Sequence, residues 1–262
     1  MSIDIRKPGT NHVIRLADRH ACYARDMQLY FDSFFGVVEP VVEGDWRVAD
    51  FSRCRVHNLH DGREFEFTSI PEEACDYGRF WKGGGLVFDL GAYCGLSAIS
   101  LASKADRVVA LEPDHENFAC LKRNIKRAGM GGKIFATSLA VGGECGREQY
   151  SHDSALGSGF ARLLGRPTAG VVEAVRVVTL DWLVAHFGVP SLIKLDVEGA
   201  ELEVLATAGP LLRLHHPAIA IDTFHFGGTW QKCEGMLREY GYRTLTEAPG
   251  GLEITWGWKD AA

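Results

Sequence analysis

The stretch Val87–Gly95 constrains the fold of this chain more than any other, because it joins a buried strand to a glycine turn. It has the sequence Val-Phe-Asp-Leu-Gly-Ala-Tyr-Cys-Gly. The apolar run Leu86–Leu90, interrupted only by Asp89, is typical of a buried parallel strand, and Gly91 and Gly95 follow where such a strand turns into a helix. Free N–H groups and missing Cβ atoms at such a turn let a flat or charged ligand come close. We therefore expect a nucleotide-like ligand here.

The spacing of the glycines indicates which ligand binds. A dinucleotide fingerprint needs Gly-x-Gly-x-x-Gly, whereas this turn has Gly91-x-x-x-Gly95 with Asp89 two residues earlier. The carboxylate would repel a pyrophosphate and suits a positive group, such as the amino group of S-adenosylmethionine. The next strand, Arg107–Leu111, leads into Glu112, at a position where nucleotide-binding folds hold ribose hydroxyls. These residues favour a binding site for S-adenosylmethionine. The alternative is a purely structural glycine turn with an acid on the surface.

Strands and helices alternate regularly from Gly83 to the end of the chain. We expect helices over 95–104, 115–128, 180–187, 200–214 and 229–240, and strands over 87–90, 108–111, 133–139, 175–178, 191–196, 217–222, 242–246 and 252–258. Short connections between them predict an α/β fold with a doubly wound, mostly parallel sheet. The terminal hairpin fits a last strand that is antiparallel to the others.

Residues 1–80 are predicted to form an N-terminal extension ahead of the sheet domain at 81–262. Aromatic residues recur at three- and four-residue intervals in Ala17–Phe35, which indicates an amphipathic helix. Short alternating runs then predict a small β-rich module, with a hairpin turn at Asp61-Gly62: Trp46–Phe51, Arg55–Leu59 and Glu64–Ser69. We expect the helix aromatics to be core residues or, as the alternative, part of a lid.

A Gly- and Ser-rich stretch inside the sheet domain, residues 142–170, is expected to be irregular and to contain an insert at 145–170. Long loops in compact domains are often functional or mobile, so we predict substrate contacts there, with Arg162 or Arg166 available for an anionic group. The insert and the N-terminal helix would then close over the acceptor. A solvated loop is an equally good interpretation.

Composition excludes several classes of protein. The net charge of −6 and the pI of about 5.9 offer no basic surface for nucleic acid. The cysteines are odd in number (7) and never in Cys-x-x-Cys spacing, which indicates neither a disulfide framework nor a zinc site. No stretch has the length of a membrane span, and the N-terminus has no apolar signal region. We expect a cytoplasmic protein.

Acidic residues stand at the ends of four apolar strands: Asp89, Glu112, Asp196 and Asp222. The carboxyl ends of parallel strands lie along one edge of a sheet, where ligands bind. One such acid is usually a helix cap or a solvated carboxylate. Four on one edge indicate a positively charged cofactor, a hydroxyl-rich ligand or a divalent metal.

Several segments resemble the FkbM family of S-adenosylmethionine-dependent methyltransferases, and the resemblance extends over about Gly83–Asp222. The residues that carry it are Asp89–Gly95, Leu111–Pro113, Thr179–Asp181 and Ile193–Glu201. The last of these contains Lys-x-Asp-Val-Glu-Gly-Ala-Glu, which is specific to that family, whereas the glycine turn is common to most class I methyltransferases. Two positions depart from the family pattern, because Tyr93 replaces a small polar residue and Asp222 replaces the more usual Glu.

The resemblance implies a seven-stranded sheet with an antiparallel last strand and O-methylation of a sugar, polyketide or other secondary metabolite. It also implies cofactor roles for the acid and glycines of the turn and for Glu112, with Asp196 facing the acceptor. We add neighbouring residues to the cofactor site: Tyr93 inside the turn, Pro113 after Glu112, and Ser138 near the expected adenine position.

Two routes could activate the acceptor's hydroxyl, which is a poor nucleophile while neutral. Asp196 and Asp222, with Glu198, could hold a divalent cation such as Mg²⁺. Alternatively, His225 could act as the general base. Lys194, on the same strand face as Asp196, is a further catalytic candidate, and positioning without a metal or base is the third possibility.

Other functions are less favoured by the residues. A NAD-dependent oxidoreductase or epimerase would need a different glycine spacing, and no Tyr-x-x-x-Lys pair is present. A non-catalytic S-adenosylmethionine-binding module stays open. We expect a small hydroxylated acceptor as the partner, neither nucleic acid nor membrane, and leave a homo-oligomer open.

Overall fold

The computed structural model describes residues 2–17, 28, 31–35, 39–52, 58–60, 63–65, 77–152, 159–160, 162–163, 171–223, 225, 227–248 and 253–259. The chain divides into two compact units. One comprises Met1–Asp76 with Ala248–Leu252, and the other comprises Tyr77–Glu247 with Glu253–Ala262. None of the helices in the described ranges is long and apolar enough to cross a membrane.

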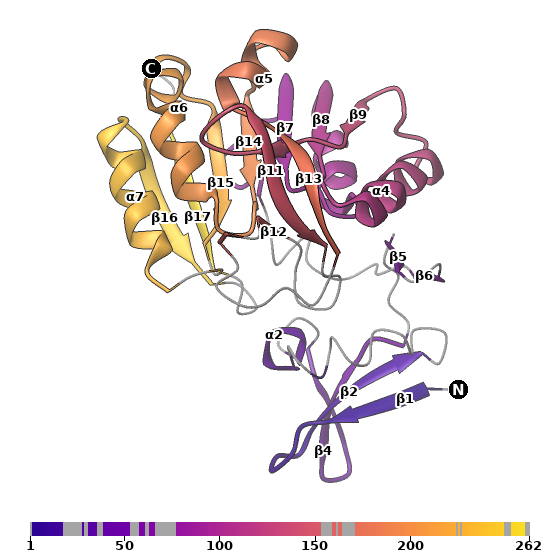
Figure 1. The fold of residues 1–262 in the computed structure, drawn as a ribbon. Coiled ribbons are helices and arrows are strands. Elements are labelled where there is room, and N and C mark those ends of the chain that lie inside the picture. The colour runs from indigo at the N-terminus through magenta and orange to yellow at the C-terminus, as the bar shows by residue number, and fades with distance from the viewer. Residues whose placement is uncertain are drawn as a thin grey trace. The chain divides into compact units, whose positions relative to one another are not determined.

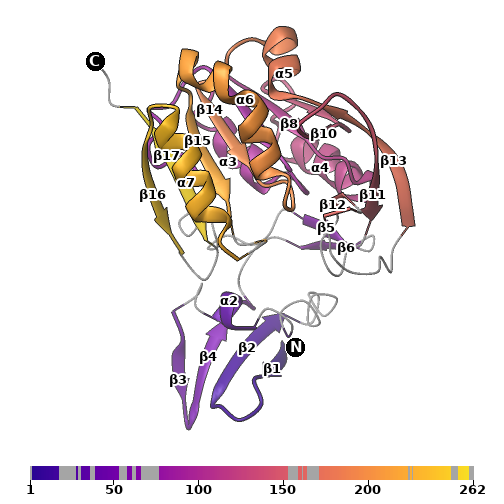
Figure 2. The same ribbon diagram turned by 60° about the vertical axis from the view of Figure 1, so that its left-hand side comes forward.

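The smaller unit contains a four-stranded sheet in the order β1-β2-β4-β3; Figure 1 labels three of its strands and Figure 2 labels all four. Its strands are β1 (Ser2–Arg6), β2 (His12–Ala17), β3 (Val41–Glu43) and β4 (Trp46–Asp50). The expected hairpin is confirmed, because β5 (Asn58–His60) pairs antiparallel with β6 (Arg63–Phe65). Of the predicted helix Ala17–Phe35, the structure describes α2 (Phe31–Phe35), in which Phe31 and Phe35 are buried as core residues. Most of the rest lies outside the described residues.

The larger unit is built on a seven-stranded sheet in the order β16-β17-β15-β14-β7-β8-β9, as expected for an α/β fold. The strands are β7 (Leu86–Leu90), β8 (Arg107–Leu111), β9 (Ile134–Thr137), β14 (Leu192–Leu195), β15 (Ala218–Asp222), β16 (Arg243–Glu247) and β17 (Ile254–Trp258). Neighbouring strands are parallel except for β17, which runs antiparallel to both β15 and β16.

Helices cover both faces of this sheet because successive strand residues point to opposite sides. Val87 and Val108 pack with α3 (Leu96–Ala102) and α4 (His115–Arg127), whereas Phe88 and Val109 belong to the other core. That second core is completed by α5 (Leu180–Phe187), α6 (Glu201–His215) and α7 (Thr229–Glu239). Figure 2 shows α6 and α7 together on one side of the sheet. The sheet is therefore doubly wound, as predicted.

The expectation of an irregular insert is wrong for its first part. Gly146–His152 forms β11, which pairs antiparallel along its whole length with β13 (Val171–Val178). With β10 (Ala140–Val141) and β12 (Gly159–Phe160) these strands make a second, four-stranded sheet. The sequence Gly-Arg-Glu-Gln-Tyr-Ser-His has little intrinsic strand preference, so its partner strand decides its conformation. Residues 153–158 and 164–170 lie outside the described part of the chain.

Candidate active site

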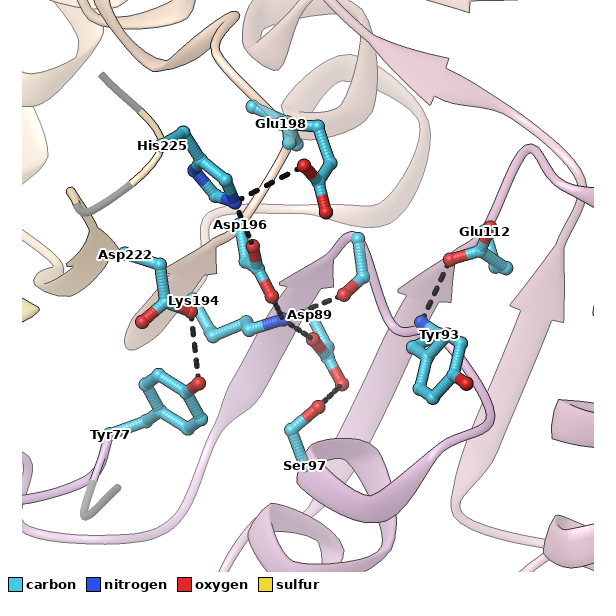
Figure 3. A network of polar contacts seen from close by, with 12 residues as sticks. Tyr77, Asp89, Tyr93, Ser97, Glu112, Lys194, Asp196, Glu198, Asp222 and His225 are labelled. Atoms are coloured by element: carbon cyan, nitrogen blue, oxygen red, sulfur yellow. Dashed lines mark hydrogen bonds and ion pairs between the residues drawn. The ribbon is translucent and has the colours of Figure 1, made fainter. Parts of the chain in front are cut away.

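The strand order of the seven-stranded sheet reverses between β7 and β14. The chain runs from β7 outward to β8 and β9, and then returns to the other side of β7 for β14 and β15. Ligands of open α/β sheets bind at such a reversal. The acids predicted from the sequence lie along this edge, and Figure 3 shows how their side chains meet.

Lys194 lies at the centre of this group of acids. Its Nζ donates to the carbonyl oxygen of Gly91 at 2.6 Å and to Asp196 Oδ2 at 3.1 Å, and it is 3.5 Å from Asp89 Oδ1. Asp89 is 0% exposed, and its other oxygen accepts from Ser97 Oγ at 2.7 Å. Burial alone would lower the pKa of Lys194, but the surrounding carboxylates outweigh it and raise that pKa above its ordinary value. Lys194 is thus a buried cation that ties the glycine turn to Asp196.

Asp196 follows β14 and Asp222 ends the adjacent strand β15, and the pKa values of the two carboxyl groups shift in opposite directions. Burial would raise the pKa of Asp196, but Lys194 and His225 hold it below its ordinary value. For Asp222, burial and the charge of Asp196 raise the pKa well above the ordinary value. Asp222 Oδ2 accepts from the hydroxyl of Tyr77 at 2.9 Å. Asp196 is therefore the ionised and more exposed member of the pair.

His225 is surrounded by carboxylates from the loop that joins β14 to α6. Its Nε2 is 3.4 Å from Asp196 Oδ1 and 3.4 Å from Glu198 Oε2, and its Nδ1 is 3.3 Å from Glu201 Oε1. Burial opposes its positive charge, but Glu198, Glu201 and Asp196 raise the pKa of His225 to about 11. An imidazole with that pKa keeps its proton at neutral pH, so a general-base role would require removing a proton that three carboxylates hold.

The loop geometry explains why these carboxylates converge. Glu198 has a φ of 54°, which is uncommon for a residue with a side chain. Glu201 Oε1 accepts from the backbone N–H of Val197 at 3.1 Å and of Gly199 at 3.2 Å. The loop is therefore tied to the first residue of α6, and the Glu198 side chain turns toward His225.

The cofactor side of the edge is built differently, because Glu112 accepts its hydrogen bonds from backbone N–H groups. Its two oxygens accept from the N–H of Tyr93 at 2.8 Å and of Asp114 at 2.9 Å. Burial raises the pKa of Glu112 to about 8, although these two hydrogen bonds oppose the shift. Tyr93 has a φ of 49°, and it is 42% exposed. Pro113 is half-buried and Ser138 is exposed at the end of β9.

The glycine turn corrects one expectation from the sequence, namely that its N–H groups are free for a ligand. The N–H groups of Gly91 and Ala92 donate to the carbonyl oxygen of Leu111, and that of Tyr93 donates to Glu112. Gly91 is required for a different reason, since a Cβ there would lie 1.7 Å from the carbonyl oxygen of Asp196. The turn is thus held by β8 and packs directly against β14.

The structure brings some of the predicted site residues together and separates others from the site. Asp196, Glu198 and His225 place three potential metal-ligand atoms within 4.8 Å of one another, a set in which His225 stands in place of the expected Asp222. We expected Arg162 to be available for an anionic acceptor, but the structure pairs it with Glu148 and Glu203. Sequence reasoning missed Tyr77 and Ser97 as partners of the acids. Tyr77 lies 145 residues from Asp222 in the chain, and no local pattern connects them.

Comparisons with known proteins concern the family and the fold of the chain. A family model described as the methyltransferase FkbM domain matches residues 89–244. The solved structure of the methyltransferase FkbM from Methylobacillus flagellatus KT has a TM-score of 0.54 at 18% identity. That match covers 93% of this chain and 56% of the other, so this chain spans little more than half of that protein's length. None of the curated proteins matches this chain.

Two other solved structures are more distant. A precorrin-6y C5,15-methyltransferase from Geobacter metallireducens GS-15 has a TM-score of 0.47 and 11% identity, over 72% of this chain and 87% of that one. A ribosomal protein L11 methylase from Lactobacillus delbrueckii subsp. bulgaricus has a TM-score of 0.42 and 14% identity, over 72% and 77%. The family model covers more than half of the sequence and includes the glycine turn, Glu112 and the strand-end acids. The chain therefore belongs to the FkbM family of S-adenosylmethionine-dependent methyltransferases.

Proposed function

We propose that this chain transfers the methyl group of S-adenosylmethionine to a hydroxyl group of a small molecule, such as a sugar, a polyketide or another secondary metabolite. The observation that carries this proposal is the contact between Gly91, in the cofactor turn, and the backbone of Asp196. Because these residues touch, a cofactor at the turn and an acceptor at Asp196 would share one crevice. The net charge of −6 also suits a small neutral or cationic acceptor better than a nucleic acid.

The residues present fit this cofactor. Each oxygen of Glu112 accepts one backbone N–H and keeps a lone pair for a ribose hydroxyl. Tyr93, Pro113 and Ser138 would border the same side. Asp89 is fully buried against Lys194 and Ser97. We therefore assign it to holding the glycine turn in place and to the acidic environment around the turn. When bound, S-adenosylmethionine supplies an electrophilic methyl group on a positively charged sulfur.

Asp196 is the residue that we assign to the acceptor. Its side chain is 27% exposed, whereas those of Asp89 and Lys194 are 0% and 3% exposed. The carboxylate accepts a hydrogen bond from the acceptor's hydroxyl, orients its oxygen and receives its proton as the new bond forms. A weak base is sufficient here, because the oxygen becomes strongly acidic once it is methylated. Lys194 acts as a positioning residue, since it holds Asp196 ionised without reaching the acceptor.

The test combines cofactor binding with methyl transfer. Calorimetry should show binding of S-adenosylmethionine and no binding of NAD, and methyl-labelled cofactor should label at least one member of a panel of hydroxylated acceptors. Asp196→Asn should keep cofactor binding and lower the transfer rate by about a hundredfold. Asp45→Asn, at an exposed position between β3 and β4, is the matched control and should transfer normally. Binding of NAD instead would overturn the proposal, and cofactor binding without transfer to any acceptor would indicate a binding module.

A further inference from the structure

We propose that Asp196, Glu198 and His225 form the binding site of a divalent metal ion. One ligand atom from each residue lies within 4.8 Å of the other two, and both carboxylates approach the same nitrogen, His225 Nε2, at 3.4 Å. Two ligands of one ion, each about 2.1 Å from it and near the tetrahedral angle, lie about 3.4 Å apart. The two measured separations have that value, and an ion bound there would displace the proton that His225 otherwise carries.

The orientation of His225 is the second observation that points to an ion. Metal-bound histidines usually direct their other ring nitrogen to a carboxylate or carbonyl oxygen. His225 Nδ1 faces Glu201 Oε1 at 3.3 Å, and Glu201 is 0% exposed and fixed by two backbone N–H groups. Glu201 therefore orients the ring so that Nε2 points toward Asp196 and Glu198, as Figure 3 shows.

The charges around the site provide a third observation. Carboxyl groups outnumber basic groups in this cluster, which contains Asp89, Asp196, Glu198, Glu201 and Asp222 against Lys194 and His225. Asp222 is 1% exposed, lies beside Asp196, and its Oδ1 has no hydrogen-bond partner within the described part of the chain. Buried oxygens of this kind are costly unless they are paired. A divalent cation at Asp196 would add positive charge beside these oxygens.

The ligand atoms also indicate the type of ion. One imidazole nitrogen with two carboxylate oxygens suits ions such as Mn²⁺, Fe²⁺ or Zn²⁺ better than Mg²⁺, which prefers oxygen ligands alone. Asp196 and Glu198 side chains are 27% and 36% exposed, so an ion could enter and keep open positions for an acceptor. Bound there, the ion would lower the pKa of the acceptor's hydroxyl, whose proton then passes to Asp196 as in the proposed function. This catalytic role rests on the proposed function, whereas binding of the ion does not.

The experiment measures binding of Mn²⁺ to the full chain, first stripped with a chelator. Electron paramagnetic resonance should show one Mn²⁺ taken up per chain, and pulsed spectra of the bound ion should show coupling to an imidazole nitrogen. His225→Asn should abolish the nitrogen coupling, and both it and Glu198→Gln should weaken binding by at least about tenfold. The matched controls are His216→Asn and Glu203→Gln, which alter a histidine and a glutamate outside the cluster and should bind as the unaltered chain does.

The outcomes separate this inference from the proposed function. Uptake well below one ion per chain at millimolar Mn²⁺, or a bound ion without nitrogen coupling, would overturn the metal site even if a variant fails to fold, because both are measured on the unaltered chain. Equal affinity in His225→Asn would overturn it as well. Binding of S-adenosylmethionine and methyl transfer are measured separately, so a chain that binds Mn²⁺ with nitrogen coupling but transfers no methyl group refutes only the proposed function.

Discussion

Glu112 on the cofactor side and Asp196 on the acceptor side are both held at carboxyl ends of the same sheet, but their charges are balanced by different means. Glu112 accepts from backbone N–H groups of Tyr93 and Asp114, which are dipoles without net charge. Asp196 instead faces the ammonium of Lys194 and the imidazole of His225. The pKa of Glu112 is consequently raised to about 8, whereas that of Asp196 is lowered. Burial therefore dominates the pKa of Glu112, whereas the charges of Lys194 and His225 outweigh burial at Asp196.

The largest expected effect comes from removing the buried cation. Lys194→Met leaves buried Asp89 without its counter-ion and Asp196 with His225 alone, which should lower the free energy of unfolding by about 3–5 kcal/mol. Urea unfolding followed by circular dichroism measures the loss. Arg162→Ala is the matched control, because Arg162 also meets two carboxylates but its side chain is 41% exposed, and its loss should cost about 1 kcal/mol or less. Equal losses of free energy in the two variants would show that burial does not determine how much these ion pairs contribute to stability.

The contact between the two sides can be broken at Gly91. In Gly91→Ala the new Cβ would meet the carbonyl oxygen of Asp196 at 1.7 Å, so the turn or β14 must shift, at about 3 kcal/mol or more of stability. Gly129→Ala is the control, since Gly129 has a φ of +68° with nothing within 4 Å of its Cβ position, and should cost about 1–2 kcal/mol. The difference between the variants isolates the clash. If both lose the same stability, the contact is not rigid.

The smallest expected effect is on the cofactor side, where Glu112 should make the stability of the chain depend on pH. Between pH 4.5 and about 8, folded Glu112 retains a proton that the unfolded chain has released, so its contribution lowers the free energy of unfolding as pH rises. The free energy of unfolding of the unaltered chain minus that of Glu112→Gln should therefore fall by roughly 1 kcal/mol per pH unit across this window. Urea titrations at several pH values between 5 and 8 test this. A difference that stays constant with pH would mean that Glu112 titrates normally.

Local patterns in the sequence determined the elements of the larger unit and the residues at their ends. Apolar runs of strand length, helical periodicity and the Gly91–Gly95 turn are properties of short segments. They were sufficient to predict the strands that have Asp89, Asp196 and Asp222 at or beside their carboxyl ends. The order of parallel strands then requires these ends to meet at one edge. The acids of the site were therefore predictable without any knowledge of packing.

Contacts between distant segments decided the rest. Nothing near Gly146–His152 indicates a strand, because its conformation depends on hydrogen bonds to β13. The need for Gly91 arises from the backbone of Asp196, and the hydroxyl of Tyr77 reaches Asp222 across 145 residues. Likewise, only the folded loop after β14 brings Glu198 and Glu201 to the two nitrogens of His225. Side-chain periodicity and turn chemistry act within a few residues, whereas the charge environment of each acid depends on every group that the fold packs around it.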